Sequence, residues 1–384
     1  MSSLEEFYQN NNDGSYHFNS TFKQLISDGE SKCEVKGDTL LVYIPMIKDY
    51  AKIHKSQLEK LQDMEEPAFP NFKYLENYGI KFKNYHEIAI SVNHKYWYID
   101  GSPDQWRAKP LRFKIGDNLF EISLMSKFMA LVTESIYGDE EYGYIDFEHW
   151  ATMKIVINNK SDHKEEFCKG LYYLNSHYLK DHEFHATLTR LSTTDYHEDH
   201  MIDDEDLLKI TSKMTRSNMR TREDFTNIEP LNLYNASVSM SGDQKFLCLY
   251  RILEFFMYRS LINVLHESRN DKSITDENLY EFLNIRQEVQ QLKHLLKDAL
   301  TASEKKEIAN FCNYHKLIDA KDFEKVSGAL YSYRNSLVHA KEREIGKTVF
   351  PNPFTNVQGN SSWIYVLEII TRRCIKKYNT IKPL

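Results

Sequence analysis

Residues Leu330–Ala340 read L-Y-S-Y-R-N-S-L-V-H-A and end a segment whose apolar residues recur at steps of three and four. This spacing predicts an amphipathic helix. Its apolar positions are Phe323, Val326, Leu330, Tyr333 and Leu337. Three polar residues interrupt the pattern: Arg334, Asn335 and His339. A helix turns by about 100° per residue, so Asn335 and His339 are expected one turn apart on one face, with Arg334 beside them.

These residue types suit chemistry on a phosphodiester. Arg334 carries a permanent charge and a planar fork of donors that fits phosphate oxygens. His339 has an ordinary pKa of about 6.5, so it can exchange a proton near neutral pH. Asn335 can orient either side chain. Attack of a ribose 2'-hydroxyl on the adjacent phosphate needs a base for the hydroxyl and a cation for the developing charge, and it needs no metal.

The motif R-N-S-L-V-H resembles the R-x4-6-H signature of HEPN domains, including the polar residue that often follows the Arg. It lies in the fourth of five expected helices. About 80 residues upstream, Phe246–Phe256 (F-L-C-L-Y-R-I-L-E-F-F) resembles the first helix of ApeA-like HEPN proteins. The resemblance spans about Gly242–Tyr378 and does not extend to the first 235 residues.

The resemblance implies an all-α helical bundle that dimerises and brings two R-x4-6-H motifs into one cleft. It also implies a metal-independent endoribonuclease of a bacterial toxin or anti-phage (abortive-infection) system, with RNA as substrate and no cofactor. In that mechanism His339 handles a proton, Arg334 stabilises the phosphate charge and Asn335 positions one of them. The N-terminal domain would then sense a trigger, bind an inhibitor or select the RNA.

Other interpretations of the motif stay open. An Arg and a His near a helix C-terminus are commonly a surface cation and a partner of the helix dipole. A HEPN-like domain can also be a non-catalytic module that binds RNA or protein. A third alternative places a metal at His197 and His200, within the acidic segment Asp195–Asp206. Their spacing matches no familiar metal site, and a solvated acidic loop is favoured.

The first expected helix of the C-terminal domain, Asp243–His266, is apolar on most of its surface and should be largely buried. Arg251 and Glu254 lie inside this run, three residues apart, so they are expected to be paired. One interpretation is a buried ion pair between them that fixes helix packing. The functional alternative is that Glu254 or Arg251 reaches Arg334 and His339 and orients them.

Further basic residues lie near the motif and in the last helix. Lys341 and Arg343 follow the motif directly, and Arg372 and Arg373 belong to the last turns of the expected helix Ser361–Tyr378. Favourable placement near the negative helix end explains the latter pair. Contact with RNA phosphates is the functional alternative for all four.

The 384 residues suffice for two domains, and 27% charged residues with 41% hydrophobic ones are typical of a globular protein. We predict an α+β chain: a β-rich α+β domain over residues 1–235, then the all-α domain over residues 242–384, joined by a linker at Asn227–Gly242. The net charge is about -7, but residues 242–384 have 22 Lys and Arg against 17 Asp and Glu. A basic helical domain beside an acidic one is consistent with RNA contact.

The N-terminal domain is expected to contain several strands. The patterns predict strands at Thr39–Met46, Leu111–Ile115, Leu119–Ser123 and Met153–Ile157, and a hairpin over Glu87–Asp100. Gly116-Asp117-Asn118 is a turn signal between two of these strands. Helical patterns occur at Tyr50–Asp63, Met125–Ile136 and Lys164–Leu179. The pairing of the strands cannot be derived from these patterns.

Five widely spaced cysteines argue against a disulfide framework or a zinc knuckle and favour reduced thiols in a cytoplasm. The start M-S-S-L-E-E-F has no signal-peptide pattern, and no apolar run reaches the roughly 18 residues of a membrane span. Motifs of P-loop NTPases, α/β-hydrolases and zincins are also missing from the sequence. We therefore expect a cytoplasmic protein without a membrane segment.

Overall fold

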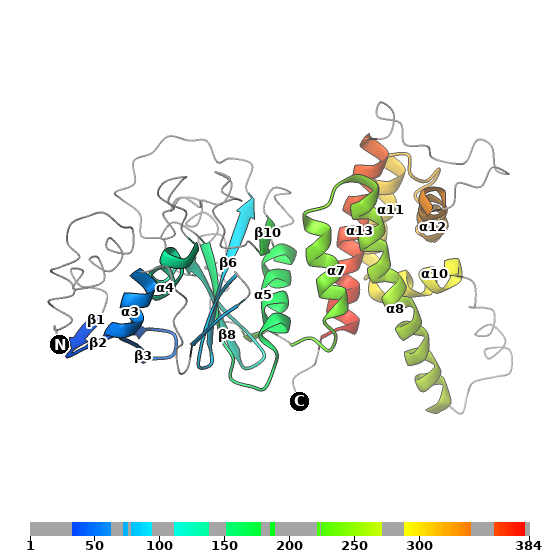
Figure 1. The fold of residues 1–384 in the computed structure, drawn as a ribbon. Coiled ribbons are helices and arrows are strands. Elements are labelled where there is room, and N and C mark those ends of the chain that lie inside the picture. The colour runs from blue at the N-terminus through cyan, green and yellow to red at the C-terminus, as the bar shows by residue number, and fades with distance from the viewer. Residues whose placement is uncertain are drawn as a thin grey trace. The chain divides into compact units, whose positions relative to one another are not determined.

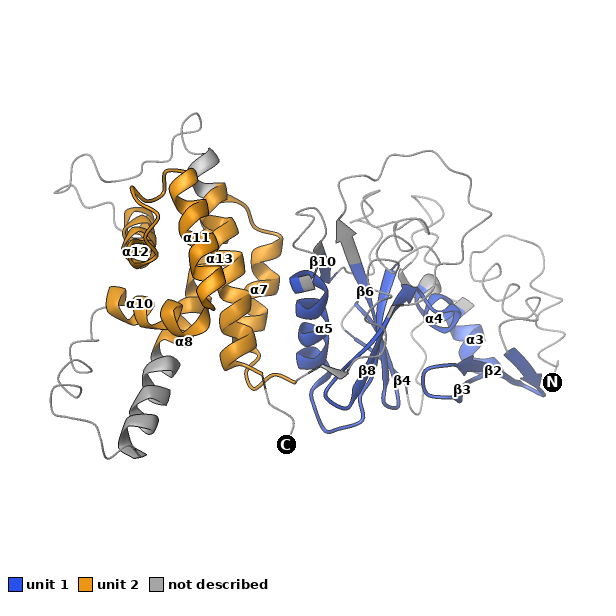
Figure 2. Cartoon of the chain, turned by 180° about the vertical axis from the view of Figure 1, so that it is seen from behind, with its two compact units in different colours: residues 1–222 blue, residues 223–384 orange. Residues whose placement is uncertain are grey.

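The computed structural model consists of two compact units, Met1–Arg222 and Glu223–Leu384 (Figures 1 and 2). The first contains antiparallel sheets and the second contains helices, which confirms a mixed α and β chain. The structure describes residues 33–62, 72–75, 78–93, 111–137, 151–177, 185–188, 221–222, 224–270, 288–338 and 357–380.

The predicted linker Asn227–Gly242 is wrong, because its central residues form helix α7 (Glu229–Val238). Pro230 lies in the first turn, where its missing N–H costs nothing. Leu231 and Tyr234 are buried, and the thiol of Cys248 lies 3.2 Å from the carbonyl of Leu233. The segment resembles a linker because its many Asn and Ser residues mask a short apolar stripe. Since α7 packs on the helical unit, the boundary between the two units falls earlier, after Arg222.

A small antiparallel sheet opens the described part of the first unit. It consists of β1 (Cys33–Lys36), β2 (Thr39–Ile44) and β3 (Asp49–His54), and α3 (Lys55–Gln62) follows directly. The prediction of a helix over Tyr50–Asp63 is therefore wrong for its first five residues. Ala51 and Ile53 are buried while Lys52 and His54 are exposed, a period of two that fits pairing with β2.

The larger sheet has the strand order β11-β7-β8-β9-β6-β5-β4, and β10 also pairs with β6. Among the pairs of described strands in this sheet, β11–β7 alone is parallel. Its strands are β4 (Phe72–Tyr74), β5 (Gly79–Phe82), β6 (Tyr85–Asn93), β7 (Leu111–Ile115), β8 (Asn118–Leu124), β9 (Ala151–Val156), β10 (His185–Leu188) and β11 (Thr221–Arg222).

The predicted strands of this sheet are confirmed at β7, β8 and β9. The turn between β7 and β8 is confirmed too: Gly116 adopts φ +54°, a conformation that glycine enters without strain. Of the hairpin expected over Glu87–Asp100, β6 supplies one strand, and residues 94–100 lie outside the described residues.

Helices α4 (Lys127–Tyr137) and α5 (His163–His177) lie on opposite sides of the large sheet (Figure 1). On the α5 side, Tyr173 stacks on Phe113 with ring centroids 4.3 Å apart. A Cβ at Gly170 would lie 2.6 Å from the sulfur of Met153, so the helix approaches the sheet too closely for a side chain there. On the other side, α3, α4 and the small sheet share one hydrophobic core with the large sheet.

The second unit is built around the long helix α8 (Gly242–Asn270), which contacts α7, α10, α12 and α13. Figure 1 shows α13 running alongside α8, and the two helices are in contact. The other helices are α10 (Glu288–Ala299), α11 (Ala302–Tyr314), α12 (Glu324–Val338) and α13 (Val357–Tyr378). The predicted burial of α8 is confirmed: Phe246, Tyr250, Leu253 and Met257 are all buried. A capping box begins α11, with Thr301 and Glu304 each accepting a hydrogen bond from the other's backbone N–H.

Asn379 joins the end of α13 to the segment before α7. Its buried amide accepts hydrogen bonds from Thr226 Oγ1 (3.0 Å) and from the backbone N–H of Asn227 (3.0 Å), and it donates to the carbonyl of Asn227 (2.8 Å). These hydrogen bonds therefore join the N-terminal and C-terminal segments of the helical unit.

We expect Asn379→Ala to lower the free energy of unfolding by about 3 kcal/mol, since it strands several buried polar groups. Asn313→Ala is the matched control: it removes an amide whose Nδ2 donates to the carbonyl of Ile318, and it should cost about 1 kcal/mol. Denaturant unfolding followed by circular dichroism measures both. Equal losses in the two variants would contradict the joining role of Asn379.

Candidate functional site

Helix α12 carries Arg334 one turn after the buried Leu330, at the margin of its buried face, and Asn335 projects about 100° further round the helix. Tyr333 fixes the rotation of the helix: its ring meets Phe246 edge-on, with centroids 4.8 Å apart, and lies 6.2 Å from Trp363. The helix ends at Val338, and His339 lies outside the described residues.

Glu254 of α8 pairs with Arg334 across 80 residues of sequence. Arg334 Nη2 donates to Glu254 Oε1 at 2.8 Å, and Arg334 Nη1 donates to Asn335 Oδ1 at 3.1 Å. The Arg334 side chain is 20% exposed and that of Glu254 is 35% exposed, so the pair lies at the border of the core. The expectation that Glu254 reaches Arg334 is therefore confirmed.

Arg251 does not share this role, and the predicted ion pair between Arg251 and Glu254 is not formed. Arg251 is exposed. The buried residues of α8 centre on Leu249 and Leu253, and Arg251 projects about 170° away from them. Glu254 lies at the margin of the buried stripe, where it meets α12 instead.

Two residues at this site had not been expected to act there: Glu288 in the first turn of α10, and Tyr250 of α8. The hydroxyl of Tyr250 donates to Glu288 Oε1 at 3.3 Å, and this oxygen lies 4.0 Å from Arg334 Nη2. The guanidinium carbon of Arg334 is 5.6 Å from the centre of the Tyr250 ring, a cation–π distance. Tyr250 lies in the helix Asp243–His266 that was expected to be largely buried, and no motif marks Glu288.

The surroundings stabilise the charge on Arg334. Partial burial disfavours the charged guanidinium, but Glu288 and Glu254 outweigh it, so the pKa of Arg334 is raised above its usual value. Burial, with Glu288 second, raises the pKa of Tyr250 far above its usual value, so its hydroxyl stays a donor. The cluster of Tyr250, Glu254, Glu288, Arg334 and Asn335 thus presents a permanent cation with restricted orientation.

The remaining predicted basic residues divide into two groups. Lys341 and Arg343 lie outside the described residues. Arg373 forms an ion pair with Glu304, and Arg372 donates from Nε to the carbonyl of Glu368 at 3.1 Å. Both arginines therefore have partners within the helical unit. RNA contact through them stays a prediction.

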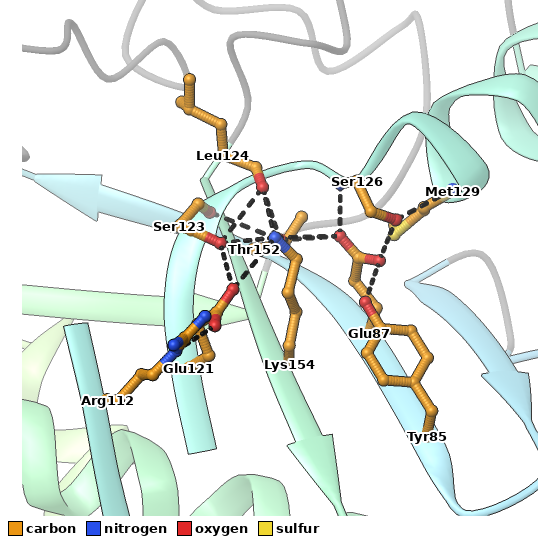
Figure 3. A network of polar contacts seen from close by, with 10 residues as sticks. All are labelled: Tyr85, Glu87, Arg112, Glu121, Ser123, Leu124, Ser126, Met129, Thr152 and Lys154. Carbon is orange, nitrogen blue, oxygen red and sulfur yellow. Dashed lines mark hydrogen bonds and ion pairs between the residues drawn. The ribbon is translucent and has the colours of Figure 1, made fainter. Parts of the chain in front are cut away.

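A second polar cluster lies in the first unit, and no motif in the sequence marks it. Arg112, Glu121, Lys154 and Glu87 are cross-strand partners on β7, β8, β9 and β6, so their charges alternate across the sheet (Figure 3). Arg112 Nε is 2.7 Å from Glu121 Oε2, and Lys154 Nζ is 3.8 Å from Glu121 and 3.9 Å from Glu87.

Glu87 is fully buried and ties this row to the start of α4 (Figure 3). It accepts hydrogen bonds from Tyr85 (2.6 Å), the backbone N–H of Ser126 (2.7 Å) and Thr152 Oγ1 (2.9 Å). Lys154 donates to the carbonyl of Leu124 at 2.6 Å. Since each charge in the row has a partner of opposite charge, we interpret the row as stabilising the sheet.

His86 is a buried titratable residue on the α5 side of the sheet. Its ring is stacked 5.6 Å from that of His163, and neither ring nitrogen has a hydrogen-bond partner among the described residues. Burial, with smaller contributions from Lys81 and His163, lowers the pKa of His86 from 6.5 to about 4.

We therefore expect the first unit to lose stability as the pH falls from about 6.5 to about 4, because the unfolded chain binds a proton there that the folded chain excludes. The loss amounts to at most about 3 kcal/mol. Denaturant unfolding between about pH 7 and about pH 4.5 measures it. His86→Phe should flatten the pH dependence, and an unchanged slope in this variant would contradict the assignment.

In the part of the chain that the structure describes, no three His, Cys, Asp or Glu residues are grouped so that they could hold a metal ion. His197 and His200 lie outside that part. None of the described cysteines forms a disulfide bond. Among the described helices, none has an apolar stretch of the length and hydropathy that crossing a membrane requires.

Comparison with protein-family models, with curated proteins and with solved structures finds no match to this chain.

Proposed function

We propose that the helical unit is a metal-independent endoribonuclease of the HEPN type, with Arg334, Asn335 and His339 as its catalytic residues. The observation that carries the proposal is the Arg334–Glu254 contact of 2.8 Å. Through this contact Glu254 of α8 holds Arg334 of α12, the arginine of the R-x4-H motif, in a partly exposed position. An arginine serving only as a surface cation needs no such partner.

The proposed reaction transfers the phosphate within the RNA strand. His339 accepts the proton of the 2'-hydroxyl, whose oxygen attacks the phosphorus while the bond to the 5'-oxygen of the next nucleotide breaks. Arg334 stabilises the charge on the non-bridging oxygens, the leaving 5'-oxygen takes up a proton from solvent, and His339 then returns its proton to solvent. Asn335, which accepts a hydrogen bond from Arg334, keeps the guanidinium in orientation. The products are a 2',3'-cyclic phosphate and a 5'-hydroxyl.

Further parts of the proposal come from the resemblance to HEPN domains. The active form is a homodimer that brings two motifs together around a two-fold axis. The first unit controls the nuclease by binding a trigger or an inhibitor, and the protein acts in the cytoplasm as a toxin or anti-phage effector.

A non-catalytic module is the second candidate, and the charge of the cluster favours it. Glu254 and Glu288 together outnumber the single cation Arg334, which weakens attraction of a phosphate. In this case the Arg334–Glu254 pair joins α12 to α8 and has no role in chemistry.

RNA cleavage by the purified chain in EDTA distinguishes the two candidates. The nuclease is expected to leave 2',3'-cyclic phosphate ends, identified by mass spectrometry, and His339→Ala should abolish cleavage. Cleavage that persists in His339→Ala would remove this residue from the mechanism. If the folded wild type does not cut RNA as monomer or dimer, the non-catalytic module is favoured.

A further inference from the structure

The two carboxylates beside Arg334 have different geometry. Glu254 accepts a hydrogen bond from Arg334 at 2.8 Å and so restricts the direction of the guanidinium. Glu288 lies 4.0 Å from the same nitrogen, too far for a hydrogen bond, and is held by the hydroxyl of Tyr250 instead. Glu288 therefore adds negative charge near the guanidinium without orienting it.

This additional charge opposes a phosphate. Coulomb energy falls only in inverse proportion to distance, so a carboxylate oxygen 4.0 Å from Arg334 Nη2 reduces the attraction of the guanidinium for an approaching anion. Glu254 alone would leave the cluster neutral, and Glu288 makes it negative. The side chain of Glu288 is 32% exposed, so solvent and salt weaken the repulsion without removing it.

We propose that Glu288 sets the affinity of the Arg334 site for the RNA phosphate by opposing it, whereas Glu254 positions Arg334 for the chemical step. The inference rests on the proposed nuclease function. It makes Glu288 a residue whose neutralisation strengthens substrate binding, and Glu254 a residue whose neutralisation impairs catalysis.

Binding is measured with an RNA oligonucleotide whose 2'-hydroxyls are methylated, since it cannot be cut. By fluorescence anisotropy, Glu288→Gln should bind about fivefold more tightly than the wild type at moderate ionic strength. Glu288→Asp keeps the charge and should bind like the wild type. Glu307→Gln removes a carboxylate that is exposed on α11 and bonded to Ser303, so it controls for net charge and should change affinity less than twofold.

Cleavage of unmodified RNA separates the two carboxylates. Glu288→Gln should lower KM about fivefold with little change in kcat, and Glu254→Gln should lower kcat about tenfold without a lower KM. If the wild type cuts RNA and Glu288→Gln binds no more tightly than Glu307→Gln, the inference is wrong and the nuclease assignment remains. If the folded wild type and Glu288→Gln neither bind nor cut RNA, both are wrong.

Discussion

Arg334→Ala is expected to cleave RNA about 100- to 1000-fold more slowly than the wild type, the usual loss when a charge-stabilising donor is removed from an active site. The guanidinium has donors for Glu254 and Asn335 and retains further N–H groups for a phosphate. Alanine keeps none of them. The loss should appear in kcat, because the charge develops in the transition state.

Arg334→Lys tests whether geometry matters as well as charge. An ammonium is a point charge and cannot replace the planar fork that bridges Glu254, Asn335 and substrate. We expect this variant to recover at most about a tenth of the lost rate.

The control for Arg334 lies on the same helix. Lys325→Ala removes a cation of α12 that pairs with Asp319 at 2.7 Å, and it should keep wild-type activity. Melting curves must show that all variants stay folded, since Arg334→Ala also leaves Glu254 and Glu288 without their shared counter-charge. Full activity in a folded Arg334→Ala protein would exclude the proposed catalytic site.

The second large effect is expected in the sheet of the first unit. Glu87→Ala should lower the free energy of unfolding by about 3–5 kcal/mol, because it leaves the buried Lys154 with one carboxylate fewer and strands the donors Tyr85 and Thr152. The start of α4 also loses the acceptor for the N–H of Ser126.

The exposed end of the same charge row is the matched control for Glu87. Arg112 is 48% exposed, so Arg112→Ala should cost about 1 kcal/mol or less, although it too removes an ion-pair partner. Denaturant unfolding measures both variants, and hydrogen exchange assigns the loss to β6 and β9. The double variant Glu87→Leu/Lys154→Met should cost less than the two single changes together. If the loss in the double variant equals the sum of the two single losses, Glu87 and Lys154 do not interact energetically.

Local patterns in the sequence determined much of the fold. Apolar residues at steps of three and four predicted α8 and α12, alternating apolar residues predicted β7, β8 and β9, and a glycine turn joined two of those strands. Each of these features depends on residues close in sequence, whose side-chain direction follows from backbone geometry.

The candidate site could be predicted only in part, because a helical period shows which residues share a face and not which other helix they meet. Arg334 and Asn335 were recognised from their spacing. The partner of Arg334 proved to be Glu254 and not its neighbour Arg251, and Glu288 has no local signal at all. That choice depended on how α8, α10 and α12 pack together.

In the first unit, the sequence by itself determined where several strands lie, and the tertiary structure decided their order. A period of two assigns each residue to a face of the sheet, but it contains no information on which strand is the neighbour. The charge row from Arg112 to Glu87 arises only because β7, β8, β9 and β6 are adjacent. A buried charge needs a partner of opposite charge, and in a sheet this partner lies on a neighbouring strand. Because neighbouring strands can be far apart in sequence, such pairs leave no pattern along the chain.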